Sequence, residues 1–280
     1  MKKLQLLLTG VLFSGMLGAQ KDKYWNYSEI ETANSDSVFI LSIREGDNVS
    51  SLDQFQNLEE LTIYDQDNVP EGIDNLPNLK ELSIGRSGIS DVSFLRNLEL
   101  HSLELRTNGM TDFPAEILSI STLKNLVFIE PEVNHIPEKI GGLSHLESLQ
   151  LGGRVYTAEP ESFKYTGTNV SDLPSSLASI STLKSIDISG CPIGAIPEWM
   201  YAKQELSELW VPGTQITSIP SALLDAERSN MLSIGVDSKQ GFDKDTAKRI
   251  REAKKQNGRG ISMRQAGRGM KLIVHTYYFN

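Results

Sequence analysis

Residues that could act as catalysts or metal ligands are sparse in this sequence, and they follow no catalytic spacing. The chain contains no G-x-S-x-G, no H-E-x-x-H and no P-loop pattern, so it lacks the marks of an activated serine, a zinc hydrolase or a phosphate cradle. Its one cysteine, Cys191, excludes a zinc-binding cysteine pair and a disulfide framework. The histidines lie far apart at unrelated places, namely His101, His135, His145 and His275. We therefore expect no enzyme activity, no metal and no cofactor.

Composition and charge limit the class of protein. The chain has 280 residues, of which 39% are apolar and 22% charged, which fits one large domain or two small ones and excludes a low-complexity disordered chain. Residues 1–236 carry 16 Lys and Arg against 32 Asp and Glu, whereas residues 237–280 carry 11 against 4. An acidic body is thus followed by a basic segment, residues 238–280. Such asymmetry marks either a charged interaction surface or a solvated terminal helix.

The first residues have the pattern of a secretory signal peptide. Lys2 and Lys3 precede a largely apolar run, residues 4–17, and the small residues Gly18 and Ala19 follow it. The run is shorter than the roughly 20 residues that span a bilayer. We predict that residues 1–19 are cleaved after Ala19, that no stable membrane span remains, and that the mature chain is secreted, periplasmic or in the cell envelope.

Self-similarity along the chain predicts the fold. The pattern L-x-x-L-x-L recurs nine times at intervals of 20 to 23 residues, with one interval of 37 that equals 23 plus a 14-residue insertion. In each copy the apolar positions point inward from a short strand and the x positions point outward, so no single copy can bury its apolar side alone. The copies begin at Val38, Leu58, Leu79, Leu100, Leu123, Leu146, Leu183, Leu206 and a weakened Ser229.

This pattern resembles the leucine-rich repeat family, and residues 136–151 (IPEKIGGLSHLESLQL) match it closely. Prolines recur at one place in five repeats, namely Pro114, Pro137, Pro174, Pro197 and Pro220. The resemblance implies an α/β solenoid, a curved right-handed superhelix of about nine repeats with a parallel β-sheet on its concave face. We assign residues 38–237 to this domain, with an insertion loop at residues 154–167. Because the chain has no capping disulfides, we expect a bacterial exported member.

The family usually places Asn or Cys three residues after the last strand leucine, where the side chain bonds neighbouring turns. This ladder position is occupied here by Gly46, Gln66, Ser87, Asn108, Pro131, Thr168, Cys191, Thr214 and Asp237. Gly46 and Pro131 offer no side-chain group, so the ladder is irregular. Some bacterial repeat effectors carry a catalytic cysteine in a separate helical domain, but Cys191 lies within a repeat, and we interpret it as a buried, inert thiol.

Both ends of an open solenoid need caps. At the amino end, residues 20–37, Ser28 and Glu31 form a capping box that predicts a short helix over residues 29–33. This helix would place Tyr24, Trp25, Tyr27 and Ile30 over the first repeat. At the carboxyl end, residues 243–257 read as a helix closed by Gly258, and residues 261–279 read as a β-hairpin.

The outward positions of the strands are mostly small and polar, and the exceptions are our candidate binding residues. Trp210 is a large aromatic, and Val127 with Ile129 would make an exposed apolar patch; aromatics in such places are enriched at interaction hot spots. Tyr64, Glu104 and Arg106 are further outward residues. The alternative is that the apolar ones pack under a neighbouring loop.

The insertion carries three aromatics, Tyr156, Phe163 and Tyr165, beside the edge of the concave face. Insertions in solenoids map to loops on one side, often the binding side. The alternative is a tolerated surface loop, because a longer loop adds little closure entropy.

Two functions fit this sequence. The first is a non-enzymatic, exported repeat protein that binds a protein or other macromolecule through its concave face and insertion loop. The second is a structural, self-associating envelope component, in which the basic segment docks on the acidic solenoid of the next copy. We expect no nucleic-acid partner for the acidic body.

Overall fold

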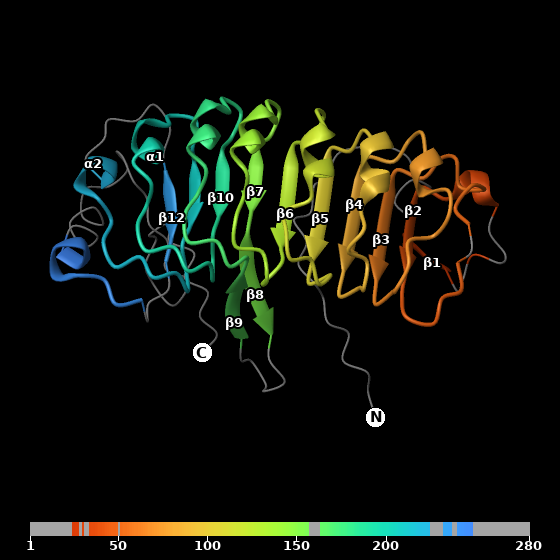
Figure 1. Cartoon of the computed structure of the whole chain (residues 1–280), viewed down its shortest axis with the longest axis horizontal. Helices are drawn as coiled ribbons and strands as arrows, with labels where there is room; N and C mark the ends of the chain where they lie inside the picture. The colour runs from red at the N-terminus through yellow and green to blue at the C-terminus, as the bar shows by residue number, and fades with distance from the viewer. Residues whose placement is uncertain are drawn as a thin grey trace.

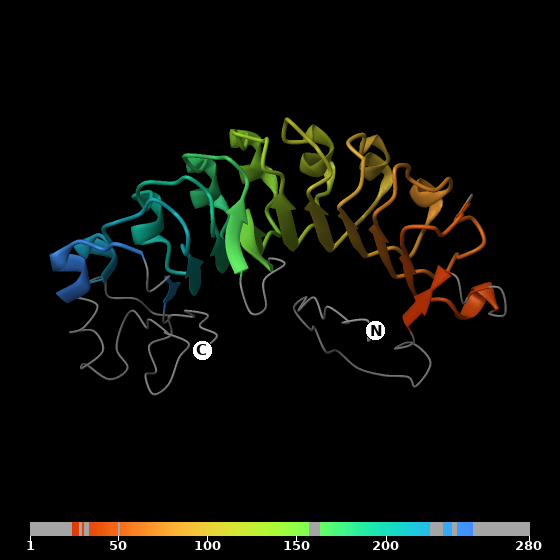
Figure 2. The same ribbon diagram turned by 90° about the horizontal axis from the view of Figure 1, so that it is seen from below.

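The computed structural model describes residues 24–27, 30, 34–49, 51–156, 163–224, 232–236 and 240–248, with the backbone alone for residues 156, 163 and 224. Ten strands lie side by side in one parallel sheet, in the order β1-β2-β3-β4-β5-β6-β7-β10-β11-β12. The strands line the inner side of an arc, and short helices lie along its outer side (Figures 1 and 2). The predicted solenoid with a parallel sheet on its concave face is confirmed.

The strands are short because each repeat contributes only one L-x-L core. They are β1 (Tyr24–Asn26), β2 (Ile40–Ile43), β3 (Glu60–Tyr64), β4 (Glu81–Gly85), β5 (Ser102–Arg106), β6 (Asn125–Ile129), β7 (Ser148–Gln150), β10 (Ser185–Asp187), β11 (Glu208–Trp210) and β12 (Ser233–Gly235). Alternation along each strand places leucine or isoleucine inward and the intervening residues on the concave face.

The outer side is built mainly of single helical turns. The 3-10 helices are η2 (Ser35–Ser37), η3 (Ile73–Asn75), η4 (Ser93–Asn97), η5 (Ala115–Ser119), η6 (Glu138–Gly142) and η7 (Ser175–Ser179), and the last repeats carry α1 (Trp199–Ala202) and α2 (Ser221–Leu224). Pro114, Pro137 and Pro174 stand directly before η5, η6 and η7, where a fixed φ favours the start of a helical turn.

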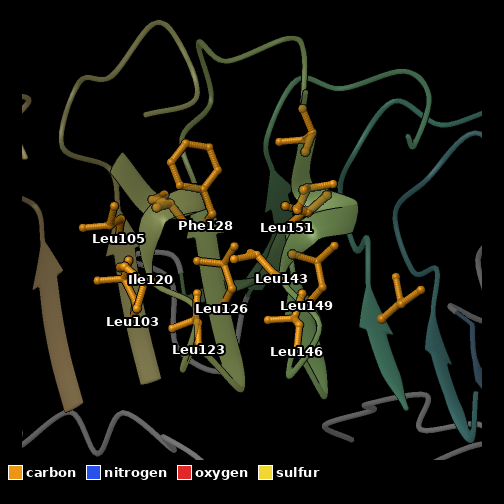
Figure 3. Close-up of a cluster of buried hydrophobic side chains, with 14 of the residues drawn as sticks. Leu103, Leu105, Ile120, Leu123, Leu126, Phe128, Leu143, Leu146, Leu149 and Leu151 are labelled. Carbon is orange, nitrogen blue, oxygen red and sulfur yellow. The ribbon is translucent and has the colours of Figure 1, made fainter. Parts of the chain in front are cut away.

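One apolar core runs through the whole arc, between the sheet and the outer turns. Leu126, Leu149 and Leu209 are fully buried at inward strand positions, and leucines of adjacent repeats stack on one another (Figure 3). In-register pairing keeps these columns aligned, since Leu126 pairs with Leu149 across β6 and β7. The repeat register inferred from the sequence is the one observed.

The amino-terminal cap contains a strand that the sequence did not predict. Tyr24–Asn26 form strand β1, which pairs in parallel with β2 and extends the sheet, because an added strand satisfies the edge of β2 as a helix cannot. Trp25, Tyr27 and Ile30 pack against the core as expected, whereas Tyr24 is 42% exposed. Of the predicted helix at residues 29–33, only Ile30 is described, and it is in a 3-10 helical conformation.

The predicted insertion is not an irregular loop. Residues 152–156 form β8 (Gly152–Tyr156), which pairs antiparallel with β9 (Phe163–Gly167) as a separate two-stranded sheet. This hairpin projects past the carboxyl ends of the parallel strands, beside β7 (Figure 1). The polypeptide then returns to the solenoid at Thr168, which is fully buried.

At the carboxyl end, residues 244–248 are helical. The carboxylate of Asp243 accepts a hydrogen bond from the backbone N–H of Thr246 at 2.6 Å, which is the bond an N-cap residue makes. The rest of the predicted helix and the predicted terminal hairpin lie outside the described residues, as does the basic run they contain.

Candidate functional site

Three of the candidate residues meet in one polar network on the concave face. The hydroxyl of Tyr64 donates to Oε1 of Glu104 at 3.2 Å, although these residues stand two strands apart, on β3 and β5. The Nε of Arg106 donates to the same carboxylate oxygen at 2.5 Å. Both charged side chains are about a quarter exposed, at 26% for Arg106 and 23% for Glu104. Glu104 is therefore held between a phenol and a guanidinium.

A glycine gives Tyr64 the space to reach Glu104. A Cβ atom at Gly85, the next strand's residue in register with Tyr64, would lie 2.3 Å from Cε1 of that ring. The guanidinium of Arg86 lies 5.8 Å from the ring centroid and pairs with the carboxylate of Asp65 at 2.8 Å. Burial and the charge of Glu104 raise the pKa of Tyr64 well above its ordinary value, so the hydroxyl remains a donor at every physiological pH.

Arg106 connects this network to the hairpin. Its Nη1 lies 3.7 Å from the position that a Cβ atom of Gly153 would occupy. On β10, burial raises the pKa of Asp187 to about 6, and the charge of Arg106 opposes that shift. The carboxylate of Asp187 also accepts the backbone N–H of Ser189 at 2.8 Å. An acidic group with a pKa near neutrality thus stands on the concave face.

The expected Val127 and Ile129 patch is wrong for one of its members. Val127 is partly exposed, but Ile129 is only 2% exposed. Its Cδ1 lies 3.7 Å from where a Cβ of Gly153 would be, so β8 covers it. The alternative in which the apolar residues pack under a neighbouring segment is the correct one for Ile129.

The hairpin is anchored at its base by glycines. A Cβ at Gly152 would lie 1.7 Å from the carbonyl oxygen of Ser189, and one at Gly167 would lie 2.7 Å from the sulfur of Cys191. Backbone contact this close is open only to glycine. The hairpin therefore rests directly on the turn after β10.

The aromatic residues of the hairpin are placed unequally. Tyr165 is partly buried, with its ring against Gly213, where a Cβ would lie 2.6 Å from that of the tyrosine. The side chains of Tyr156 and Phe163 lie outside the described residues. Val155 is 42% exposed and pairs across the hairpin with the exposed Lys164. This cross-strand pair thus places an apolar and a basic side chain next to each other on the hairpin.

Trp210 stands on the concave face but apart from the Glu104 network. Its ring lies over Gly235 of β12, where a Cβ would be 2.4 Å from Cε3. Asp187 pairs with it in register on β10, and Glu208 is two residues earlier on the same face of β11. Two acidic residues thus share the concave face with this indole.

No family model matches the chain. A curated relative, Ras guanine nucleotide exchange factor V from Dictyostelium discoideum, is 27% identical over 147 residues, which cover 46% of this chain and only 7% of that protein. Among solved structures, a leucine-rich repeat protein of Leptospira interrogans is 18% identical with a TM-score of 0.54, covering 72% of this chain and 55% of the other. Internalin C2 of Listeria monocytogenes is 20% identical with a TM-score of 0.53, covering 72% and 82%.

These structural likenesses agree with the ten-stranded parallel arc and its 20- to 23-residue period. The chain is a leucine-rich repeat protein in fold. Its ladder positions work as that fold requires: the hydroxyl of Thr168 donates to the carbonyl of Phe128 at 2.8 Å, and the thiol of Cys191 donates to that of Leu151 at 3.5 Å. Burial, with the charge of Asp187, raises the pKa of the Cys191 thiol to about 12, which fits the inert thiol that we predicted.

One residue of the leucine-rich repeat ladder was missed. Where Pro131 occupies the ladder position, the preceding Glu130 turns inward, fully buried, and accepts the backbone N–H groups of Asn108 and Met110 at 2.9 and 3.3 Å. Burial raises the pKa of Glu130, and these hydrogen bonds oppose the shift. The only feature of the sequence that could have indicated this role of Glu130 is its place directly before Pro131, which has no side-chain group to bond the neighbouring turns.

Within the described part of this leucine-rich repeat chain, no group of three or more His, Cys, Asp or Glu side chains could hold a metal ion. In the same residues, no helix is long and apolar enough to cross a bilayer.

Proposed function

We propose that this leucine-rich repeat protein is a non-enzymatic binding protein that holds another protein on its concave face, beside the β8–β9 hairpin. The observation that carries the proposal is the continuity of that face: one parallel sheet of ten strands presents a polar network at Glu104 and an aromatic at Trp210. Interfaces of standard size need about 800 Å² from each partner, which several adjacent repeats supply together.

Two features support a protein partner. The network around Glu104 already holds its side chains in place, so binding would cost little additional side-chain ordering. Trp210 and Tyr64 are large aromatics whose rings pack against the backbone of Gly235 and Gly85. Residues of this type are the usual hot spots of protein interfaces. The hairpin adds a second contact through Val155 and Lys164.

We also propose that the protein acts outside the cytoplasm, as a secreted, periplasmic or envelope protein. The support is the pattern of residues 1–19, which lie outside the described residues. Amino-terminal sequencing of the protein from the cells that produce it should find a mature chain that begins near Gln20. Cytosolic protein that retains Met1 would contradict the proposed export.

The binding function is tested by capture from the cell envelope of the producing organism. Mature protein and its Trp210→Ala variant are used as parallel baits, with Thr62→Ala as a control on the same face. A partner retained by the wild type and the control but depleted on the Trp210 variant supports concave-face binding. Equal recovery on all three baits contradicts it.

A further inference from the structure

The amino ends of the parallel strands carry a column of charged residues, one directly before each of six strands. Backbone hydrogen bonds link successive members of the column; the N–H of His101, for example, donates to the carbonyl of Lys80 at 2.8 Å. The column lies at the end of the sheet away from the β8–β9 hairpin (Figure 1). Its members, in the order of β3 to β7 and β10, are Glu59, Lys80, His101, Lys124, Glu147 and Lys184.

Glu147 shows how this column holds a negative group. It stands between Lys124 and Lys184, with its backbone N–H bonded to the carbonyl of Lys124 and its carbonyl to the N–H of Lys184. Its carboxylate accepts a hydrogen bond from Nζ of Lys184 at 2.7 Å. That bond, with the charges of both lysines, lowers the pKa of Glu147. Adjacent strands lie about 4.8 Å apart, so an acid between two lysines is favourably placed.

His101 stands where the alternation of acid and base along the column would place a second acid. It lies between Lys80 and Lys124 as Glu147 lies between Lys124 and Lys184. Burial lowers the pKa of His101, and the charges of Lys124 and Lys80 lower it further. The charge of Glu81 opposes this shift. At neutral pH the imidazole therefore carries no negative charge and little positive charge. The two lysines flank a place that a negative group would fill.

The carboxylates around this place are engaged elsewhere or only weakly attracted. Oε2 of Glu99 lies 3.9 Å from Nζ of Lys80, and the side chain of Glu99 is 80% exposed, so this ion pair contributes little. Glu147 gives its hydrogen bond to Lys184. Glu59 stands on the far side of Lys80, one strand further from the histidine. An anion from solution can thus be held between the two lysines.

We propose that Lys80, His101 and Lys124 form a binding site for an oxyanion of the sulfate or phosphate class. The anion lies between the two lysines, as the carboxylate of Glu147 does on the following strands, and an N–H group of the imidazole donates to it. Because the anion favours the protonated imidazole, its affinity rises as the pH falls. The site lies at the amino ends of the strands, so it goes beyond the proposed concave-face function and does not depend on it.

The test is a titration of the purified protein with sodium sulfate, which keeps its full charge between pH 6 and pH 8. Ionic strength is low and held constant with sodium chloride, because salt screens exposed charges. The readout is the NMR shift of the backbone amides of Ser102 and Asn125, which directly follow His101 and Lys124, with the amide of the exposed His135 as reference. Ser102 and Asn125 should shift saturably and His135 should not. Binding should be several-fold tighter at pH 6 than at pH 8.

Four variants separate the site from general charge attraction. Lys80→Gln and Lys124→Gln should each weaken sulfate binding about threefold to fivefold. Lys139→Gln, which removes an exposed lysine of η6 on the outer side, should leave it unchanged. His101→Glu puts a carboxylate where the anion binds, so sulfate binding should be lost although both lysines remain. The same change should raise the unfolding temperature at low salt, because opposite charges then alternate along the column.

The His101→Gln variant tests the role of the imidazole separately. It keeps both lysines and a polar side chain but cannot take up a proton. Sulfate should bind to this variant equally well at pH 6 and pH 8, and no more tightly than it binds to the wild type at pH 8.

Two sources of the same chemistry are told apart by comparing inorganic phosphate with glucose 6-phosphate at pH 7.5. Tighter binding of the ester indicates an anionic group carried on a larger molecule, and equal or weaker binding indicates the free ion. Either result supports the oxyanion site, provided that the ligand shifts Ser102 and Asn125 and that His101→Glu abolishes the shift.

Each contrary result overturns the proposal. Equal shifts at His135, or shifts that do not saturate, mean that sulfate acts only as a salt. Full affinity in a folded His101→Glu variant, with the fold checked by circular dichroism, means that no anion lies between the two lysines. Equal weakening by Lys139→Gln means that overall charge alone attracts the anion. A pH dependence that persists in His101→Gln means that another group takes up the proton.

Discussion

Glu130 and Asn108 form the one fully buried acidic contact within the described ladder of this solenoid. The carboxylate accepts the backbone N–H of Asn108 at 2.9 Å and its side-chain amide at 3.1 Å, while that amide also donates to the carbonyl of Ile84 at 3.1 Å. Three successive repeats are thereby joined by two side chains. Glu130 supplies, from one residue earlier, the acceptor that Pro131 cannot.

Replacing Glu130 by Ala should be strongly destabilising. The change leaves the N–H groups of Asn108 and Met110 buried without this acceptor, which costs on the order of 2–4 kcal/mol of unfolding free energy. Glu132→Ala, an exposed glutamate two residues on, is the matched control and should stay within about 0.5 kcal/mol. Urea unfolding of both variants checks this. Equal midpoints would mean that Glu130 is not part of the ladder.

The raised pKa of Asp187 leads us to expect that the stability of the protein depends on pH, with a definite sign. Burial raises the pKa of Asp187 from 3.8 to about 6, so the folded state binds more protons than the unfolded state between these values, and stability falls as pH rises through that window. Asp187→Asn should therefore stabilise the protein at pH 7.5, by on the order of 2 kcal/mol. The gain should vanish below about pH 4.

The measurement for Asp187 is thermal unfolding of wild type and variant across pH 4 to 8. Gln150→Ala, at an outward position of β7, changes no titratable group and should show no such pH-dependent difference. A variant that is less stable than wild type at pH 7.5 would show that the hydrogen bond from Ser189 and the charge of Arg106 outweigh the cost of burial.

Because the base of the β8–β9 hairpin lies against the backbone of Ser189, we expect a side chain added at Gly152 to clash there. A Cβ added at Gly152 would lie 1.7 Å from the carbonyl oxygen of Ser189, which is backbone and cannot rotate away. Gly152→Ala should cost about 2–3 kcal/mol or displace the hairpin. Gly142→Ala, with nothing within 4 Å, should be close to neutral. Denaturation midpoints decide between them, and a tolerated Gly152→Ala would mean that β8 is not seated on the turn after β10.

The inward leucines test the repeat register in solution. Leu126, Leu149 and Leu209 are fully buried, and each change to Ala should cost about 2–5 kcal/mol through lost burial and cavity formation. Gln150→Ala, at an outward position, should stay near 0.5 kcal/mol. A one-residue slip would exchange the two sets, so similar midpoints for both would refute the register.

The fold could be predicted from the sequence because it follows from a period. The L-x-x-L-x-L pattern specifies which residues point inward, and Leu126, Leu149 and Leu209 all do. Thr168 and Cys191 were correctly placed at ladder positions, since each follows its last strand leucine by a constant interval once the insertion is removed. The same alternation placed Trp210, Glu104 and Arg106 on the outward face.

What the sequence did not predict depends on contacts between distant segments. The meeting of Tyr64 with Glu104 requires the missing side chain of Gly85 between them, which alternation alone does not indicate. Ile129 is outward by alternation but buried, because β8 folds back over it. At the amino end, the strand Tyr24–Asn26 was not predicted, because it forms by pairing with the free edge of β2, a tertiary contact that the local pattern does not indicate.

The affinity of a purified partner for three forms of the chain tests the binding function most directly. These are the wild type, Trp210→Ala, and a chain lacking residues 154–167, in which the 37-residue interval returns to 23. If the concave face and hairpin bind the partner, Trp210→Ala should weaken binding roughly thirtyfold or more, and the deletion should also weaken it, with both variants folded. Unchanged affinity in both folded variants would contradict binding at this face.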